Sequence, residues 1–304
     1  MTSAPVESGT AVPLRLPDAR VRMVSDFLTL TKPRVNLLVL VTTAIGFYLG
    51  SFGTIDIGLL VHTVVGTALV AAGAAAFNQV LERDIDGRMR RTQSRPLPAG
   101  RLGIPEAGWF ALALSVAGLV ELFVGANPLA AGVALVTITS YALVYTPLKT
   151  RTSLAMVVGA VPGALPPMIG WAAATRTLSI EAWVLFSIVF FWQMPHVLAI
   201  SWMYREDYER GGIRALPVVE PDGASTARQA VIYAVALVPV SLLPTIVGLA
   251  GGFYFAGAAL VGTAQLWLAL GFARERTRER ARRLFFASLV YLPVLWGLLV
   301  LGRV

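Results

Sequence analysis

The residues best suited to chemistry lie in a polar stretch that follows a long apolar run. Asn78, Glu82 and Asp86 are spaced four residues apart, so on a helix they share one face. That face presents one amide oxygen and two carboxylates, which are hard oxygen ligands suited to a magnesium ion that bridges to a phosphate. The spacing therefore predicts a metal-binding acid ladder, the name used below for these three residues.

Arginines follow the acid ladder directly, and they include Arg91 and Arg95. A guanidinium is the side chain that best matches phosphate oxygens. A plainer interpretation is that this basic loop only anchors a membrane helix on its cytoplasmic side. That role does not require acids on one helical face, so the stretch indicates a site for magnesium and a diphosphate.

A second polar cluster comprises Trp192–His196 and the charged run Tyr204–Arg210. Four predicted spans separate the two clusters, which indicates two similar four-helix halves, plus a last helix, around a central cavity. The clusters would then face each other across the cavity mouth. His196 is either a satisfied polar residue of a membrane helix or a residue of that cavity. Lys149 is either a topogenic charge or part of a diphosphate clamp.

The composition defines the class of protein. The chain is 56% hydrophobic and 14% charged, whereas a soluble domain carries about a quarter charged residues. It is therefore predicted to be an all-α, polytopic membrane protein. The lack of cysteine excludes disulfides, thiolate catalysis and Cys–zinc or iron–sulfur sites. The net charge of +8 is better explained by loops that face anionic lipid than by nucleic acid.

Nine runs have about the 20 apolar residues that a membrane span needs. The predicted spans are Val35–Ser51, Ile57–Leu81, Pro105–Val124, Pro128–Thr146, Ser153–Ala173, Ile180–Met203, Arg228–Leu249, Gly252–Phe272 and Leu284–Gly302. Residues 1–26 are polar and lack the apolar core of a signal peptide, which predicts a disordered cytoplasmic tail. Residues 27–304 form the predicted membrane domain, in which prolines at 162, 166 and 167 could break the fifth span.

The distribution of basic residues predicts the orientation. With the N-terminus in the cytoplasm, 23 of the 25 Lys and Arg residues lie on the inner side, and only Arg176 and Arg303 do not. The C-terminus is then outside. Most of the acids gather on the same inner rim, whereas a transporter tends to keep its coupling residues near the midplane. The pattern favours an enzyme, while a transporter or a non-catalytic assembly factor is the alternative from another class.

The polar motifs together resemble those of the protoheme IX farnesyltransferases (heme O synthases), a branch of the UbiA-type intramembrane prenyltransferases. The matching stretches are residues 78–97, Tyr145–Lys149, Gly163–Trp171, Trp192–His196 and Glu206–Tyr208 with Gly211 and Leu216–Val218. The likeness extends from about Leu30 to the C-terminus. The first motif marks the whole superfamily, while its Arg-Thr-x-x-Arg-Pro extension and the Trp-Gln-Met-Pro-His motif are more specific to the heme branch.

The resemblance implies farnesyl transfer from farnesyl diphosphate to a vinyl group of heme B, which gives heme O for terminal oxidase biogenesis in a prokaryotic plasma membrane. A quinone or another aromatic compound is the alternative acceptor. It also suggests heme A synthase or terminal oxidase subunits as further partners. The implied roles are magnesium binding and catalysis by Asn78, Glu82 and Asp86, phosphate binding by Arg91, Arg95, Lys149 and Arg205, an opposite rim of Tyr204 and a catalytic Asp207, and acceptor binding near His196.

Two features depart from the superfamily pattern. Glu82 stands where many members have Asp, so the carboxylate is kept on a longer side chain. Tyr204 and Tyr208 stand where quinone-forming relatives carry paired Asp residues. This second departure favours one magnesium ion over two. Gln79, like Glu82, stands where many members have Asp. It lies about 100° around the helix from Asn78, so it need not contact the metal.

Overall fold

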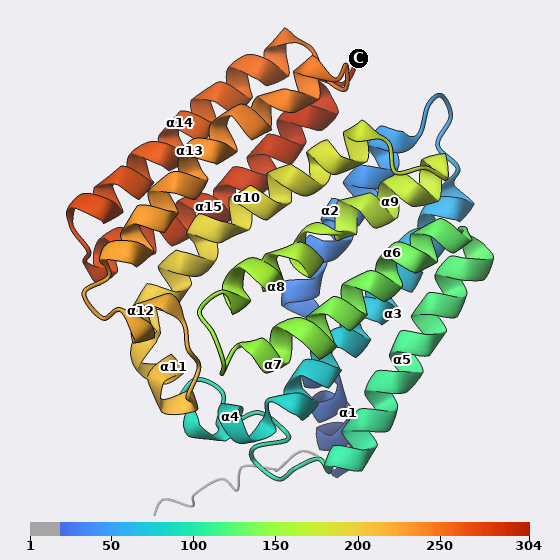
Figure 1. Ribbon diagram of the computed structural model, residues 1–304. Coiled ribbons are helices and arrows are strands. Elements are labelled where there is room, and N and C mark those ends of the chain that lie inside the picture. The colour runs from blue at the N-terminus through green and yellow to red at the C-terminus, as the bar shows by residue number, and fades with distance from the viewer. Residues whose placement is uncertain (1–18) are drawn as a thin grey trace, which may run out of the picture.

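The computed structural model describes residues 19–304, which form an all-helical bundle (Figure 1). Within this part of the chain, nine segments are long and apolar enough to cross a membrane. They are α2 (Pro33–Gly50), α3 (Ile57–Leu81), α5 (Ile104–Gly125), α6 with η1 and α7 (Pro128–Leu148), α8 with α9 (Ala155–Thr175), α10 (Ile180–Met203), α13 (Ala224–Ile246), α14 (Gly252–Arg274) and α15 (Arg278–Leu301). The nine predicted spans are confirmed, and the largest difference is that α15 begins six residues earlier than predicted.

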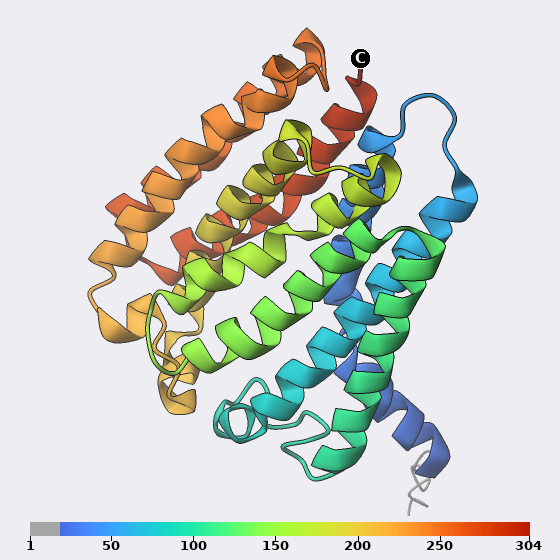
Figure 2. The ribbon, with the colours of Figure 1, turned by 45° about the vertical axis from the view of Figure 1, so that its right-hand side comes forward.

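Four short helices gather at the end of the bundle opposite the C-terminus (Figures 1 and 2). They are α1 (Ala19–Leu30), α4 (Arg83–Arg88), α11 (Arg205–Gly211) and α12 (Leu216–Val219). The first 18 residues of the expected tail lie outside the described residues. Residues 19–26 belong to α1, so this part of the segment expected to be disordered is helical.

The spans pack as two groups that lie side by side (Figure 1). Helices α2, α3, α5 and α6 form one group, and α10, α13 and α14 form the other, with α15 packed on both α10 and α14. The fifth span links the groups, because α8 contacts α10 while α9 packs chiefly on α2. Two four-helix halves and a last helix therefore describe the bundle.

The fifth span is broken where the sequence predicts a break. Pro166 and Pro167 lack backbone N–H groups, so α8 (Ala155–Ala164) ends and α9 (Pro166–Thr175) begins after Leu165. Helix α9 then crosses α2 at very short range. Gly170 permits this approach, because any side chain there would collide with the backbone of α2. Residues 166–173 are all buried.

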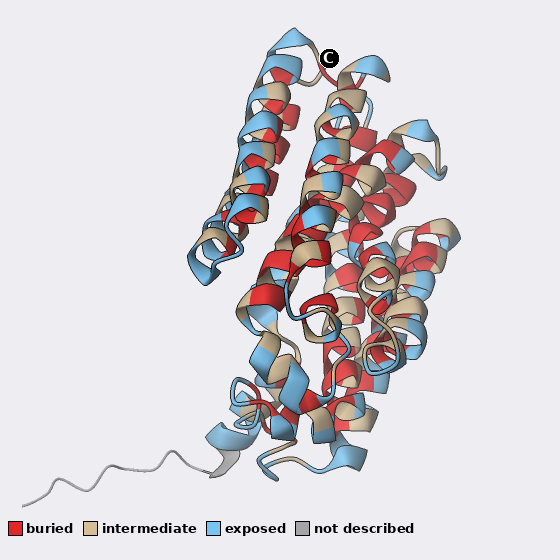
Figure 3. Ribbon diagram, turned by 60° about the vertical axis from the view of Figure 1, so that its left-hand side comes forward, coloured by how far each residue is buried: buried red, intermediate tan, exposed pale blue. Residues whose placement is uncertain are grey.

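The outer helices bury only one side (Figure 3). Their other side exposes large apolar residues such as Val120 on α5 and Leu260 on α14. An apolar surface of this kind is stable when lipid covers it. The polar residues that remain buried at the end of the bundle with α4 and α11 therefore need another explanation.

Candidate active site

The acid ladder spans the bend between α3 and α4. Glu82 lies at this bend, yet the hydrogen bonds of a helix continue through it: the Glu82 N–H donates to the Asn78 carbonyl (3.0 Å) and the Asp86 N–H to the Glu82 carbonyl (2.7 Å). The three side chains consequently share one face, in line with their spacing. All three are buried, whereas the neighbouring Asp84 is exposed.

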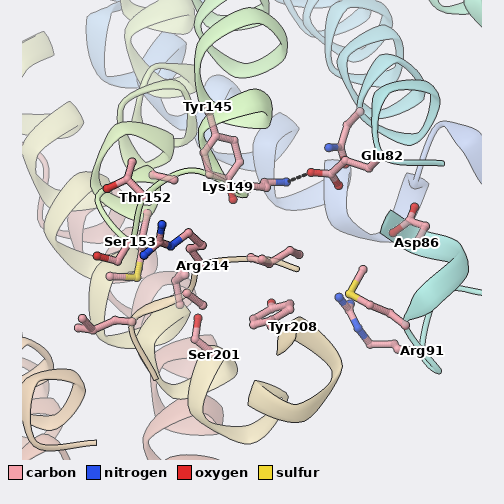
Figure 4. Close-up of a pocket in the computed structure, with 18 of the residues that line it drawn as sticks. Glu82, Asp86, Arg91, Tyr145, Lys149, Thr152, Ser153, Ser201, Tyr208 and Arg214 are labelled. Carbon is pink, nitrogen blue, oxygen red and sulfur yellow. Dashed lines mark hydrogen bonds and ion pairs between the residues drawn. The ribbon is translucent and has the colours of Figure 1, made fainter. Parts of the chain in front are cut away.

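The ladder lines a cavity of about 230 Å³ at this end of the bundle. Helices of both halves contribute to its wall, which combines tyrosines and apolar side chains with an excess of bases over acids (Figure 4). Two carboxylates of the described residues face it, from Glu82 and Asp86. The five bases that line it are Lys32, Arg91, Arg95, Lys149 and Arg214.

Each member of the acid ladder accepts a hydrogen bond from one base, and each base comes from a different segment. The pairs are Lys32 Nζ to Asn78 Oδ1 (2.9 Å), Lys149 Nζ to Glu82 Oε1 (2.6 Å) and Arg95 Nη1 to Asp86 Oδ2 (2.5 Å). The ladder oxygens are thus held by cations of the protein itself. The same cations are within reach of any anion that enters the cavity.

Lys32 reaches the ladder because of an unusual turn between α1 and α2. Its backbone is left-handed (φ 47°, ψ 56°), a conformation that costs a residue other than glycine about 1–3 kcal/mol. Gln79 Nε2 stabilises the turn by donating to the carbonyl of Leu30 at 3.0 Å and that of Thr29 at 3.3 Å. Gln79 therefore points away from the ladder and positions the lysine.

Lys149 is positioned by a wide helical turn, η1 (Ser140–Tyr145), in the fourth span. Turns of this π type occur often at functional sites. The Lys149 ammonium lies 4.4 Å from the centre of the Tyr145 ring and 6.0 Å from that of Tyr141. Burial works against the charge, but Tyr145, Tyr141 and the hydrogen-bonded Glu82 raise the pKa of Lys149 above its ordinary value. Lys149 is therefore charged at neutral pH.

The remaining electrostatics favour an anion. Burial, together with the nearby charges of Arg95 and Lys149, lowers the pKa of Lys32 to about 7. Burial is the larger cause, and the two neighbouring cations add to it because like charges disfavour the charged form of a lysine. The donor set of the ladder also fits a magnesium ion, since it offers an amide oxygen and two carboxylates. Asp86 Oδ1 is buried and has no hydrogen-bond partner among residues 19–304.

Three residues predicted for the site, two on the opposite rim and one as a phosphate ligand, lie outside this cavity. Tyr204, Arg205 and Asp207 line a separate pocket of about 400 Å³ on the other side of α11 and are not among the residues of the cavity wall. Asp207 Oδ1 accepts hydrogen bonds from Arg210 Nη1 (2.9 Å) and from the backbone N–H of Arg90 (3.3 Å). Its observed contacts stabilise the loop after α4.

Arg205 and Tyr204 each take part in a contact between a guanidinium and an aromatic ring. The Arg205 guanidinium lies 4.6 Å from the Trp202 ring centre, and the Tyr204 ring lies below the Arg91 guanidinium at 5.4 Å. Tyr204 thus supports a cavity base without lining the cavity. These side chains face outward because α11 starts after a bend, which a count of residues from the sixth span does not reveal.

His196 also lies outside the cavity wall. Its Nδ1 is 2.8 Å from Ser288 Oγ on α15, and its ring lies between Trp192 and Phe285 with centroid distances of 5.4 and 4.8 Å. The next residue, Val197, lines the cavity instead. The helix thus turns the His196 side chain toward α15 and away from this cavity, and its expected role in acceptor binding stays a prediction.

The sequence interpretation missed Lys32, Tyr208 and Arg214, which all line the cavity. Tyr208 lies across from Lys149 and Glu82 (Figure 4), and burial raises its pKa, so its hydroxyl keeps its proton. A signal for Lys32 was present. Among 25 basic residues the chain has only two lysines, at 32 and 149, and both occur in this cavity.

A cavity of this charge, at one end of a nine-span bundle, is typical of an intramembrane enzyme that acts on a phosphorylated substrate. The chain belongs to the UbiA prenyltransferase family, whose family model matches residues 39–290. It is a multi-pass membrane protein and a prenyltransferase of that family.

Curated relatives cover nearly the whole chain. The protoheme IX farnesyltransferase of Solibacter usitatus is 50% identical over 287 residues, which are 91% of this chain and 98% of the relative. The enzyme of the same name from Myxococcus xanthus is 45% identical over 283 residues, 92% and 95% of the two chains.

Solved structures share the fold. A structure of digeranylgeranylglyceryl phosphate synthase matches with a TM-score of 0.78 at 19% identity, over 92% of this chain and 98% of the other. A UbiA homologue from Archaeoglobus fulgidus, bound to GPP and Mg²⁺, matches with a TM-score of 0.64 at 15% identity, over 90% and 99%.

Proposed function

We propose that this protein transfers the farnesyl group of farnesyl diphosphate to a vinyl group of heme B, which gives heme O for terminal oxidases. The observation that carries the proposal is the acid ladder, held by three bases in a cavity with surplus positive charge. The choice of heme and farnesyl diphosphate as substrates is supported by the names of relatives that are up to 50% identical. A quinone or another aromatic acceptor has no comparable support.

The diphosphate would bind between the two halves of the bundle. The three bases that hold the ladder can turn from its oxygens to phosphate oxygens; they are Lys32, Lys149 and Arg95. Further positive charge comes from Arg91 and Arg214 in the same wall. The Tyr208 hydroxyl, opposite Lys149, would donate a hydrogen bond to the same group. The farnesyl chain would continue toward the apolar part of the wall, at Met156 and Val197.

The reaction breaks the bond between C1 of the farnesyl group and the diphosphate oxygen, and the electron pair leaves with the diphosphate. The bases of the cavity stabilise this leaving group more as its charge develops. A vinyl carbon of heme B then bonds to C1, and water adds to the resulting cation and loses one proton to the solvent or the departed diphosphate, which supplies the hydroxyl of heme O. The rings of Tyr141 and Tyr145 lie near enough to the ladder to stabilise a nearby allylic cation.

The acid ladder would hold one magnesium ion. When bound, it neutralises charge on the departing diphosphate. Asn78, Glu82 and Asp86 would each direct an oxygen to it. Glu206 and Asp207 line the outer pocket, so no second acidic cluster of the described part of the chain reaches the cavity. The donor set consequently supports one ion.

The test is heme O formation by the purified protein. Supplied with farnesyl diphosphate, heme B and Mg²⁺, it should produce heme O that is detected by pigment extraction and chromatography, and excess EDTA should abolish the product. Full turnover in EDTA would contradict the metal site. Consumption of farnesyl diphosphate with a quinone precursor, but not with heme B, would contradict the acceptor.

The proposed orientation places the cavity at the cytoplasmic face of a prokaryotic plasma membrane, with the N-terminus inside and the C-terminus outside. The distribution of 23 basic residues supports it. A reporter fused after Val304 that works only outside the cytoplasm should be active. Heme A synthase and terminal oxidase subunits, which use the product, are the proposed partners, and crosslinking in native membranes would test them.

A further inference from the structure

A hollow of about 600 Å³ lies outside the active site, where the end of α10 meets the start of α15. Its wall is formed by the end of α10 and the start of α15, and its residues are Met203, Tyr204, Arg278, Glu279, Arg282, Phe285 and Phe286. The one carboxylate among them, that of Glu279, pairs with Arg283. None of its lining residues belongs to the wall of the active-site cavity. The hollow is therefore a separate feature, at the same end of the bundle.

An apolar groove of about 390 Å³ continues from this hollow between α14 and α15, and the two share Phe286. On α15 the residues in sequence are Arg278, Arg282, Phe286, Val290 and Val294, each four positions after the last. Residues four apart form a continuous inclined row on a helix. This row changes from two arginines to three apolar side chains as α15 enters the span.

The arginines of this region fall into two sets. Arg280 pairs with Glu275 (2.9 Å), and Arg283 pairs with Glu279. Arg278 and Arg282 have no carboxylate partner among residues 19–304, although acids are close along the chain. The Arg282 guanidinium instead lies 5.5 Å from the Phe286 ring centre, at the point where the hollow meets the groove.

We propose that this row is a binding site for an anionic phospholipid. Its phosphate would lie in the hollow between Arg278 and Arg282, and one acyl chain would follow Phe286, Val290 and Val294 along the groove. The chemistry fits a membrane lipid better than a soluble anion, because the apolar part of the row is exposed on the side that faces the bilayer. Basic pockets at the membrane interface bind such head groups.

The test measures lipid selectivity of the full chain in detergent by native mass spectrometry. Titration with dioleoyl phosphatidylglycerol should give binding about ten- to thirty-fold tighter than titration with dioleoyl phosphatidylcholine, since each interfacial arginine contributes on the order of a few-fold to tenfold. The double variant Arg278→Ala/Arg282→Ala should lose this preference. A matched control, Arg274→Ala/Arg280→Ala, removes the same charge from a different pocket, between the end of α14 and the start of α15, and should keep the preference.

Three outcomes would overturn the proposal: equal binding of the two lipids by the wild type, equal loss in the two double variants, or effective competition by glycerophosphoglycerol, which has the head group without acyl chains. Thermal unfolding in phosphatidylcholine alone verifies that both variants fold. If the alanine pair does not, Arg278→Gln/Arg282→Gln takes its place, because glutamine removes the charge but keeps a polar side chain longer than that of alanine.

Discussion

Helices α3 and α10 each end in a bend that leads into a short helix, α4 in the first half of the bundle and α11 in the second. Glu82 and Tyr204 occupy these bends with similar backbone angles, φ −100°, ψ 9° and φ −113°, ψ 21°. Four residues later, Asp86 and Tyr208 hold matching places, and both line the cavity. Helices α4 and α11 pack on each other across its mouth.

The two halves share a backbone bend but place different side chains in the cavity. The backbone bend is repeated, but the first half supplies two carboxylates and the second half supplies one phenol, since Tyr204 faces outward. The proposed metal-binding donor set therefore comes from one half alone. The other half contributes the Tyr208 hydroxyl and the Arg214 guanidinium, which are suited to an anion. Substitutions at matching places should consequently have very different effects.

The largest difference is expected between the acid ladder and its exposed neighbour. Glu82→Gln and Asp86→Asn keep the shape of the side chain but remove the charge, and each should lower turnover about a thousandfold. Asp84→Asn should change it by no more than a few-fold, because Asp84 is exposed on another face. Heme O formation at matched membrane levels and saturating Mg²⁺ is the measurement. Equal damage at Asp84 would contradict the shared face.

The next largest difference in activity is expected between basic residues inside the cavity and a basic residue outside it. Lys149→Ala and Lys32→Ala remove charged donors from the cavity and should lower kcat/KM for farnesyl diphosphate about ten- to a hundredfold. Arg205→Ala, which removes a base stacked on Trp202, should cost a few-fold at most. If Arg205→Ala were as severe as Lys149→Ala, Arg205 would also contribute to diphosphate binding, and its assignment to the outer pocket alone would be wrong.

A smaller effect distinguishes the two tyrosines of the second bend. Tyr208→Phe removes a hydroxyl from the cavity, and a neutral hydrogen bond accounts for about a tenfold change in kcat/KM. Tyr204→Phe retains the ring that supports Arg91 and should behave like the wild type. Steady-state assays with varied farnesyl diphosphate compare the two variants. A reversed order would place Tyr204 in the cavity.

The smallest effect on catalysis is expected at His196. Because His196 packs between Trp192 and Phe285, His196→Ala should lower the melting temperature by a few degrees and leave the KM values for both substrates unchanged. His196→Gln, which can still bond to Ser288, should recover part of the stability. A selective rise in the KM for heme B would restore the role in acceptor binding.

The spans and the acid ladder could be predicted because each depends on local pattern. Length and apolarity define a membrane span, and spacing by four survives the bend at Glu82 since the hydrogen bonds run through it. The proline break after Leu165 is equally local. The predicted start of α15 is too late because four arginines, at 278, 280, 282 and 283, precede its apolar part although they belong to the same helix.

The contribution of the second half depends on orientation, which a single sequence does not encode locally. The rotation of α11 after its bend decides that Tyr208 lines the cavity and that Asp207 contacts Arg90. Lys32 was missed for a similar reason, since a left-handed turn and Gln79 bring it to Asn78 from 46 residues away. The rarity of lysine in this chain was the one compositional sign of its place.

The three pairs between ladder and bases also bear on the order in which ligands load. The ladder oxygens accept hydrogen bonds from Lys32, Lys149 and Arg95. A cation would have to displace these bases from the oxygens, and an anion would have to draw the bases away from the same oxygens. Each ligand therefore removes the competitor of the other, so the two affinities are thermodynamically coupled, and the coupling is reciprocal. Calorimetric titration of diphosphate with and without Mg²⁺ should give the same factor as the reverse experiment, and a factor of one would show independent sites.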